Sequence, residues 1–352
     1  MPSSRNLTAF AYRNVPVSFG EVTRAAHFRG ELRPYADRLA WELACEVEAE
    51  RLALERDDEA IESLLNGFRY GLDLISAEET ESWLESRGLD GDDLEAYIDR
   101  CYWWGTLKDR VAPGQGGDFP GVPEQLGTLE SELFLSGGFT PLAIGLSRRL
   151  VAGQDPASRP GSERVAEERR RFLARTGLEP EGIAGWLGSL DRGLPWFGEM
   201  LELEAAYSLS CELILTPERF SGELARARLS LTRLELERVE FDSIDAAREA
   251  HLCVRHDGMS LEDVARETRY PFRRLELLAE DLPETQRQKL LCAGIGEVQA
   301  PEDAGGVFQL VRVLSKAEPN LSEATVRQRI EQRILDGHFL EAGSEDVSWL
   351  IR

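Results

Sequence analysis

DLPETQRQKLLCAGIGEVQAPEDAGGVFQLVRVL, residues 281–314, is the stretch that decides the fold. Its first part, Leu282 to Ala293, is an apolar helical run. A Gly-x-Gly-Glu-Val turn follows at Gly294 to Val298, where glycine adopts positive φ at little cost. The run Val307 to Leu314 favours a strand covered on both faces, because its apolar residues fall on both parities. The stretch predicts a helix, a tight corner, a loop and a central strand of a small α+β unit.

The totals predict a folded, acidic protein. A length of 352 residues, of which 42% are hydrophobic, is sufficient for two or three domains with cores. The formal net charge of -23 repels phosphate backbones and anionic lipid, so neither nucleic acid nor a membrane is expected as a partner. A basic or neutral peptide is compatible with this charge.

The cysteines and the absence of apolar segments indicate the compartment. Five cysteines lie far apart, without a CxxC pair, and are expected to be reduced core residues. The first residues contain no apolar run typical of a signal peptide, and no run approaches the roughly 20 residues of a membrane span. We therefore expect a cytoplasmic protein.

The chain divides by composition into five parts. Residues 1–110 form a helix-rich module, and 111–123 are a linker rich in Gly and Pro. Residues 124–228 form a second helical module. An α+β domain at 229–316 and a C-terminal helix and strand at 317–352 complete the chain.

The two helical modules have matching sequences. Trp83-Leu84 matches Trp186-Leu187, and Gly88-Leu89 matches Gly193-Leu194 with two residues inserted between. Such an ordered set of matches predicts a duplicated module with an apolar groove or contact surface between the copies.

Local patterns place several other elements. Residues 8–19 read as a strand, a turn and a second extended piece, and Ser76 with Glu79 forms a capping box that opens a helix. Leu231–Phe241 reads as a strand of uncertain register, because its apolar parity changes in a way that allows a bulge or a late helix end. A last helix is expected from 319 to 337, followed by a strand at 347–352.

These elements resemble a known family. Residues 231–316 are similar to a parvulin (rotamase) domain, with the helices DAAREA and GMSLEDVA, the GIGEV corner and the strand VFQLVRVL. Residues 1–110 resemble the helical part of SurA-like chaperone-isomerases. The whole chain looks like the PpiC-related proteins of gene clusters that mature ribosomally made peptides. The resemblance implies an α+β protein with a mostly helical SurA-like N-terminal region, a parvulin-like domain and a C-terminal helix plus strand.

The family's catalytic pattern is degenerate in this sequence. The first-strand histidine falls at Arg238, and the last-strand histidine, eight residues after Pro301, falls at Gln309. The family's Cys or Asp falls near Pro271, and the Met and Phe of its proline pocket fall at Leu282 and Gln286. We therefore expect no catalytic residues; Arg238 and Gln309 can also be plain structural residues. The candidate peptide-binding residues are Arg238, Leu282, Gln286, Phe308 and Gln309.

Other motifs predict no metal or cofactor site. His251 and His256 are five residues apart and do not share a helix face. The glycines of GQGG at 114–117 lack the Lys-Ser/Thr of a phosphate-binding loop. The basic run RRRFLAR, residues 169–175, is either a solvated helix face or a site for an acidic peptide segment.

The favoured interpretation is a non-catalytic, chaperone-like protein that binds a precursor peptide and presents it to pathway modification enzymes, with a homodimer possible. Strand addition or an apolar groove would suit that task. The alternatives are an active prolyl isomerase, with catalytic groups placed differently, and a protein–protein scaffold that binds no peptide.

Overall fold

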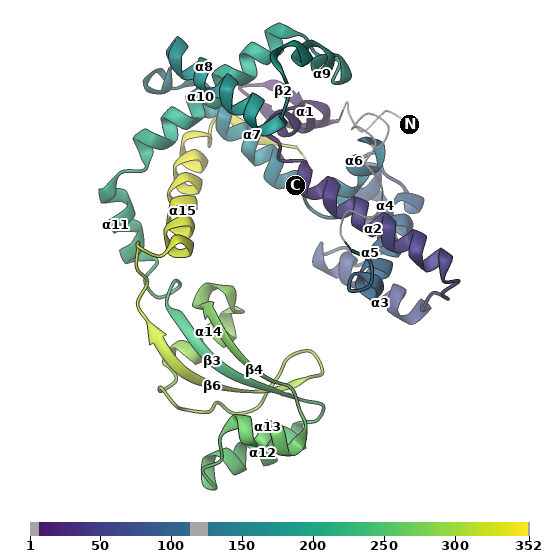
Figure 1. Ribbon diagram of the computed structural model, residues 1–352, viewed down its shortest axis with the longest axis vertical. Coiled ribbons are helices and arrows are strands. Elements are labelled where there is room, and N and C mark those ends of the chain that lie inside the picture. Colours follow the sequence, from purple (N-terminus) through teal and green to yellow (C-terminus); the bar gives the residue numbers. More distant parts are fainter. Residues whose placement is uncertain (1–6, 113–125, 351–352) are drawn as a thin grey trace. The chain divides into compact units, whose positions relative to one another are not determined.

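Residues 7–112 and 126–350 are described by a computed structural model (Figure 1). The predicted linker falls mostly outside these residues, as does the GQGG motif. The chain separates into two units, one of residues 1–213 with 339–352 and one of residues 214–338. Both contain helices and a small antiparallel sheet, so the predicted α+β class is confirmed. In the described part of the chain, no helix has both the length and the apolar character needed to cross a bilayer.

The second unit is built on a four-stranded antiparallel sheet with the order β4-β3-β6-β5. The strands are β3 (Arg233–Phe241), β4 (Phe272–Leu278), β5 (Glu302–Asp303) and β6 (Phe308–Ala317). Its helices are α11 (Pro217–Arg226), α12 (Ile244–His256), α13 (Leu261–Thr268), α14 (Glu284–Cys292) and most of α15 (Ala324–Ala342). The helix, corner and central strand predicted for residues 281–314 are confirmed as α14, a turn with Gly296 at φ 82°, and β6.

Strand β3 buries opposite faces at its two ends. Leu234 and Leu236 pack with Leu290 of α14, whereas Val239 and Phe241 pack with helices α12 and α13. Successive side chains of a strand point to opposite faces. The apolar residues of β3 therefore change from even to odd positions, because α14 covers one face of the sheet and α12 and α13 cover the other (Figure 1). A bulge is also present, because the pairing of β3 with β6 shifts between Glu235 and Leu236. On each face, the helices cover only one half of the sheet. We call the uncovered half the open half, and a site can form on it.

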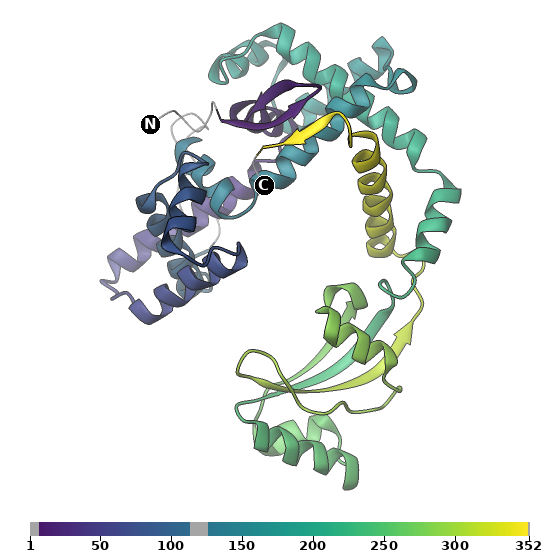
Figure 2. The ribbon, with the colours of Figure 1, turned by 180° about the vertical axis from the view of Figure 1, so that it is seen from behind.

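The first unit joins both ends of the described chain in one sheet. Strands β1 (Thr8–Tyr12) and β2 (Val15–Ser18) form the predicted hairpin, in which Arg13 and Asn14 have φ of 49° and 65°. Positive φ at both central residues gives the turn a twist that matches its strands. The predicted last strand is β7 (Val347–Trp349), which pairs antiparallel with β1 (Figure 2).

Helices make up most of the first unit. They are α1 (Phe19–Arg29), α2 (Arg33–Arg51), α3 (Asp58–Gly71), α4 (Ala77–Glu85), α5 (Gly91–Leu107), α6 (Leu126–Leu135), α7 (Phe139–Gln154), α8 (Ser162–Thr176), α9 (Ile183–Ser189) and α10 (Leu194–Ile214). The predicted capping box opens α4: Ser76 Oγ accepts from the Glu79 N–H at 3.1 Å, and the Glu79 carboxylate accepts from the Ser76 N–H at 2.8 Å.

The helix series α3-α4-α5 and α8-α9-α10 contain the same aromatic contact. Phe68 of α3 meets Trp83 of α4 edge-on at 5.7 Å between ring centroids, and Phe172 of α8 meets Trp186 of α9 edge-on at 5.1 Å. The matched Trp-Leu pairs of the sequence therefore occupy corresponding positions on the second helix of each series.

The matched Gly-Leu pairs are not equivalent. Leu89 is buried at 3% exposure, whereas Leu194 is 66% exposed. In the second series, the buried leucine of the turn after α9 is Leu190, which is 6% exposed. The two inserted residues move Gly193-Leu194 past that position.

The last helix, α15 (Ala324–Ala342), differs from its predicted limits. Asn320 makes a turn, in which its side-chain oxygen accepts from the Ser322 N–H at 2.9 Å, so the helix begins later than expected. It also continues through Gly337. A glycine inside a helix costs only about 1 kcal/mol, and Phe339 beyond it is buried against Tyr207, with ring centroids 5.4 Å apart.

The five cysteines are free thiols. Cys45 is buried, as a core cysteine is expected to be, whereas Cys292 is exposed at the last position of α14. The other three, Cys101, Cys211 and Cys253, are half-buried.

Candidate functional site

The candidate site lies on the open half of the sheet face that α14 covers. Arg238 and Glu240 alternate along β3, and Gln309 and Val311 alternate along β6. The register pairs Arg238 with Val311 and Glu240 with Gln309, so the four side chains share one face. The two positions where the family has histidines are therefore diagonal neighbours on adjacent strands.

Glu240 links these two positions. Its Oε1 lies 3.1 Å from Nη2 of Arg238 and accepts a hydrogen bond from Nε2 of Gln309 at 3.4 Å. The third family position, near Pro271, is adjacent, because the Pro271 carbonyl accepts from the Glu240 N–H at 3.4 Å. Sequence reasoning missed Glu240, although its spacing of two residues from Arg238 on a strand was a sign that both share a face.

A pocket of about 280 Å³ lies beside this group. It brings together two of the predicted residues, Gln286 of α14 and Gln309 of β6. Lys289 and Glu302 also line it and form an ion pair of 2.7 Å with each other. The remaining lining residues are Leu290, Gln299, Ala300, Pro301 and Val311.

The GIGEV corner holds the loop side of the pocket in place. Gly296 donates to the Val313 carbonyl at 2.7 Å, and the Gln299 backbone N–H donates to the Val311 carbonyl at 2.8 Å. These bonds hold the segment alongside β6 and place Gln299 opposite Val311, while Glu302 of β5 pairs with Gln309. Nε2 of Gln299 is buried and has no hydrogen-bond partner among the residues described.

Three predicted residues do not line the pocket: Arg238, which lies in the neighbouring group on β3, and Phe308 and Leu282, which lie elsewhere. Phe308 faces the opposite side of the sheet from Gln309 and packs with Phe241 in the cluster under α12 and α13. Leu282 packs with Leu290 in the cluster under α14. Both side chains contribute to the core of the unit at these places.

The site is rich in hydrogen-bond donors and poor in groups that titrate near neutral pH. Arginine stays protonated in proteins, and glutamine does not titrate. The pocket contains no histidine or cysteine. Such a surface can bind peptide carbonyl and amide groups. In the described ranges, no cluster of three or more His, Cys, Asp or Glu side chains is suited to a metal ion.

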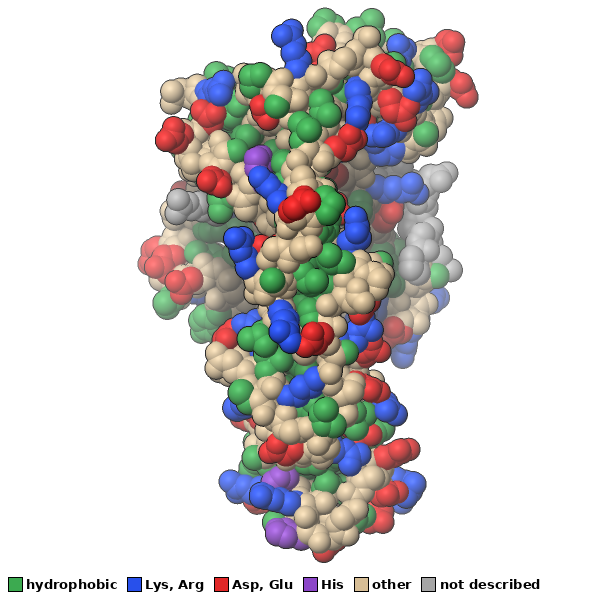
Figure 3. Space-filling model, turned by 90° about the vertical axis from the view of Figure 1, so that its left-hand side faces the viewer, with side chains coloured by type: hydrophobic (Ala, Val, Ile, Leu, Met, Phe, Trp, Pro, Cys, Tyr) green, Lys and Arg blue, Asp and Glu red, His purple; other side chains and the backbone are tan. Residues whose placement is uncertain are grey.

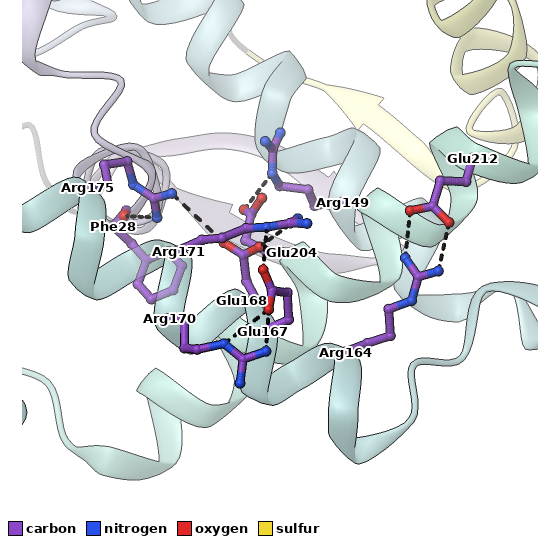
Figure 4. A network of polar contacts seen from close by, with 10 residues as sticks. All are labelled: Phe28, Arg149, Arg164, Glu167, Glu168, Arg170, Arg171, Arg175, Glu204 and Glu212. Carbon is purple, nitrogen blue, oxygen red and sulfur yellow. Dashed lines mark hydrogen bonds and ion pairs between the residues drawn. The ribbon is translucent and has the colours of Figure 1, made fainter.

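The basic run at 169–175 is largely neutralised by its own helix (Figure 4). Arg170 and Arg171 pair with Glu167, and Arg171 lies 3.6 Å from Glu168. Arg175 donates to the Phe28 carbonyl at 3.0 Å. On the face drawn in Figure 3, basic side chains likewise lie among acidic ones. The helix-face interpretation fits these contacts better than a site for an acidic peptide.

Comparisons with known proteins find similarity only among solved structures. No family model and no curated protein matches the chain. The peptidylprolyl isomerase PrsA of Bacillus anthracis is 9% identical over 58% of this chain and 96% of its own, with a TM-score of 0.35. PrsA of Bacillus cereus is 13% identical over 62% and 84%, with a TM-score of 0.36. A SurA-like chaperone of Campylobacter jejuni is 8% identical over 62% and 89%, with a TM-score of 0.22. The likeness is remote.

Proposed function

We propose that this chain is a chaperone-like peptide-binding protein that holds an extended precursor peptide for the modification enzymes of a ribosomal-peptide pathway. One observation carries the proposal. Within the described part of the second unit, two buried side-chain N–H groups lack a partner, Nε of Arg238 and Nε2 of Gln299. Both are at the candidate site. A buried donor without a partner costs about 1–3 kcal/mol, which a peptide carbonyl would offset.

The sheet offers a second way to hold an extended peptide. Strand β4 pairs with β3 on one side, and no described strand pairs with its other side. An extended segment can add to such an edge through main-chain hydrogen bonds. Arg273 and Arg274 of β4 are exposed and would disfavour indiscriminate pairing between edges.

Holding rather than isomerisation is the proposed activity. Rotation about a prolyl amide has a barrier of about 18–20 kcal/mol, and a catalyst must provide a shaped proline pocket and groups that disfavour the planar amide. Here the corresponding positions are Arg238, Gln286 and Gln309, of which Arg238 is engaged by Glu240. An amide-lined pocket suits a polar backbone better than a proline ring.

The binding test is calorimetry with precursor peptides encoded beside this chain's gene. We expect micromolar binding that weakens at least tenfold in Gln299→Ala and in Gln286→Ala. Gln288→Ala is the matched control, because Gln288 lies on the same helix as Gln286 but is exposed and pairs with Glu284. No binding at high micromolar concentration, or equal losses in all three variants, would overturn the proposal.

The catalytic test is a proline-peptide isomerisation assay. We expect no acceleration above the uncatalysed rate. A kcat/KM comparable to that of active parvulins, lost in Arg238→Ala or Gln309→Ala, would establish the alternative of an active isomerase.

A further inference from the structure

Helix α3 has an apolar stripe that the first unit covers only in part. Phe68 packs edge-on against Trp83 and Tyr97, at 5.7 and 6.1 Å between centroids. No residue of α3 is fully buried, and Leu64 on the same stripe is 39% exposed. An amphipathic helix of this kind normally buries its stripe, so part of the face of α3 is without a partner in the described structure.

The corner between α3 and α4 extends this apolar surface. Tyr70 is 69% exposed, Leu72 42% and Ile75 70%. Single exposed apolar side chains are normal, but three within six residues concentrate apolar surface in the way that marks an interaction site. We call Tyr70, Leu72 and Ile75 the corner patch.

A pocket of about 640 Å³ opens beside the corner patch. Leu74, Trp83 and Leu350 form apolar walls, and Asp73, Glu78 and Glu79 supply carboxylates. Arg87 also lines the pocket, but its guanidinium lies over the Trp83 ring, 4.0 Å from the centroid, and donates to the Trp83 carbonyl. The corner patch and the pocket share the segment from Leu72 to Ile75, so a bound segment that covers one also reaches the other.

Two of the three carboxylates are uncommitted. Glu79 is used by the cap of α4, where it accepts from the Ile75 and Ser76 N–H groups, each at 2.8 Å, and these bonds lower its pKa. Asp73 and Glu78 are exposed and, within the described residues, form no ion pair or side-chain hydrogen bond. The corner therefore combines an apolar patch with unpaired negative charge.

We propose that the corner patch and its pocket dock a segment of a partner protein in which a Lys or Arg is flanked by large apolar side chains. The cation enters the pocket beside Asp73 and Glu78, and the apolar side chains cover Tyr70, Leu72 and Ile75. Charge complementarity selects this occupant. A second copy of the chain is disfavoured, because each copy carries a net charge of -23. This surface belongs to the first unit and does not depend on peptide binding at the sheet of the second.

The proposal is tested with the full chain and three fluorescein-labelled twelve-residue probes. One carries two Lys flanked by Leu and Phe, one replaces its Lys by Glu, and one replaces its apolar residues by Ser. We expect fluorescence anisotropy to show binding of the first probe in 150 mM salt, and at least tenfold weaker binding of the other two.

Variants then locate the binding. Asp73→Asn/Glu78→Gln and, separately, Leu72→Ser/Ile75→Ser are each expected to weaken the first probe at least tenfold. Glu81→Gln/Glu85→Gln is the matched control, because it removes the same charge from exposed positions of α4 that do not line the pocket. Circular dichroism melting confirms that each variant folds.

Three results would overturn the proposal. Equal binding of the Glu probe would exclude charge selection. An equal loss in the control variant would show that only the net charge of the chain attracts the probe. Self-association in sedimentation experiments that Leu72→Ser/Ile75→Ser abolishes would show that a second copy covers the corner patch.

Discussion

Replacing Phe28 with alanine tests the packing on which the first unit depends. Phe28 is the next-to-last residue of α1 and is 0% exposed. Its ring centroid lies 4.8 Å from that of Phe172, 5.8 Å from that of Phe197 and 6.1 Å from that of Trp196. These partners belong to α8 and α10, so one side chain of the N-terminal helix holds together the second helix series.

The magnitude follows from the burial. A fully buried phenylalanine removes roughly 150–250 Å² from water, which at about 25 cal/mol per Å² corresponds to about 4–6 kcal/mol as an upper estimate. Measured Phe→Ala changes in cores cost about 3–5 kcal/mol, with the high end where the site cannot collapse. Arg175 fixes the backbone here by donating to the Phe28 carbonyl at 3.0 Å. We therefore expect a loss of about 4 kcal/mol in the free energy of unfolding of the first unit.

Tryptophan emission during urea unfolding measures this loss selectively. All seven tryptophans lie in the first unit, so their signal follows that unit alone. Phe308→Ala is the matched control, because it removes the same side chain from the second unit and is expected to leave the tryptophan transition unchanged. A loss below about 1 kcal/mol in Phe28→Ala would refute the packing argument.

Two further predictions concern the first unit. Burial, more than any neighbouring charge, raises the pKa of Glu46 from 4.5 to about 7. The stabilising contribution of Glu46 is therefore present below pH 4.5 and is lost as the pH rises through 7. Glu46→Gln should reduce the fall in unfolding free energy between pH 5 and 8 by roughly 1–2 kcal/mol, and an unchanged pH profile would contradict this. Gly30→Ala should cost about 1–2 kcal/mol of unfolding free energy, because Gly30 has φ 74° and a Cβ would lie 3.1 Å from Cδ of Arg175. Gly67 lies in open space on α3, so Gly67→Ala should stabilise the first unit. Urea unfolding measures both changes.

Local sequence signals predicted the elements that depend on local physics. The hairpin at Arg13–Asn14, the cap at Ser76 and the corner at Gly296 each rest on a few neighbouring residues, and each is present. The end of α15 depends instead on distant packing. Phe339 packs against Tyr207, which is more than 100 residues away in the sequence, and the helix continues through Gly337. A local stop signal was overridden there by tertiary contact.

The candidate site was predictable in position but not in composition. The count of eight residues from Pro301 located Gln309, and the register of β3 and β6 places it beside Glu240. Strand β4 was not predicted, because its sequence FRRLELL has no clear alternation and gains strand character mainly from pairing with β3. Gln299 was missed because its role depends on a loop whose path alongside β6 is fixed by backbone hydrogen bonds.

The two open halves of the four-stranded sheet differ in one respect that bears on function. Beyond α12 and α13, the open half is occupied by ion pairs across strands: Arg312 donates to Glu237 at 2.9 Å, and Arg274 donates to Glu235 at 3.0 Å.

Each of these charges is therefore satisfied by its neighbour, and a ligand there would have to break ion pairs. Beyond α14, Arg238 also forms an ion pair, with Glu240 at 3.1 Å, but its Nε retains a buried N–H without a partner, as does Nε2 of Gln299 in the described structure. Because breaking a satisfied pair costs free energy and satisfying an orphaned donor releases it, a peptide backbone would bind the second open half in preference to the first. The sheet therefore offers a ligand the open half beyond α14, whereas ion pairs occupy the open half beyond α12 and α13.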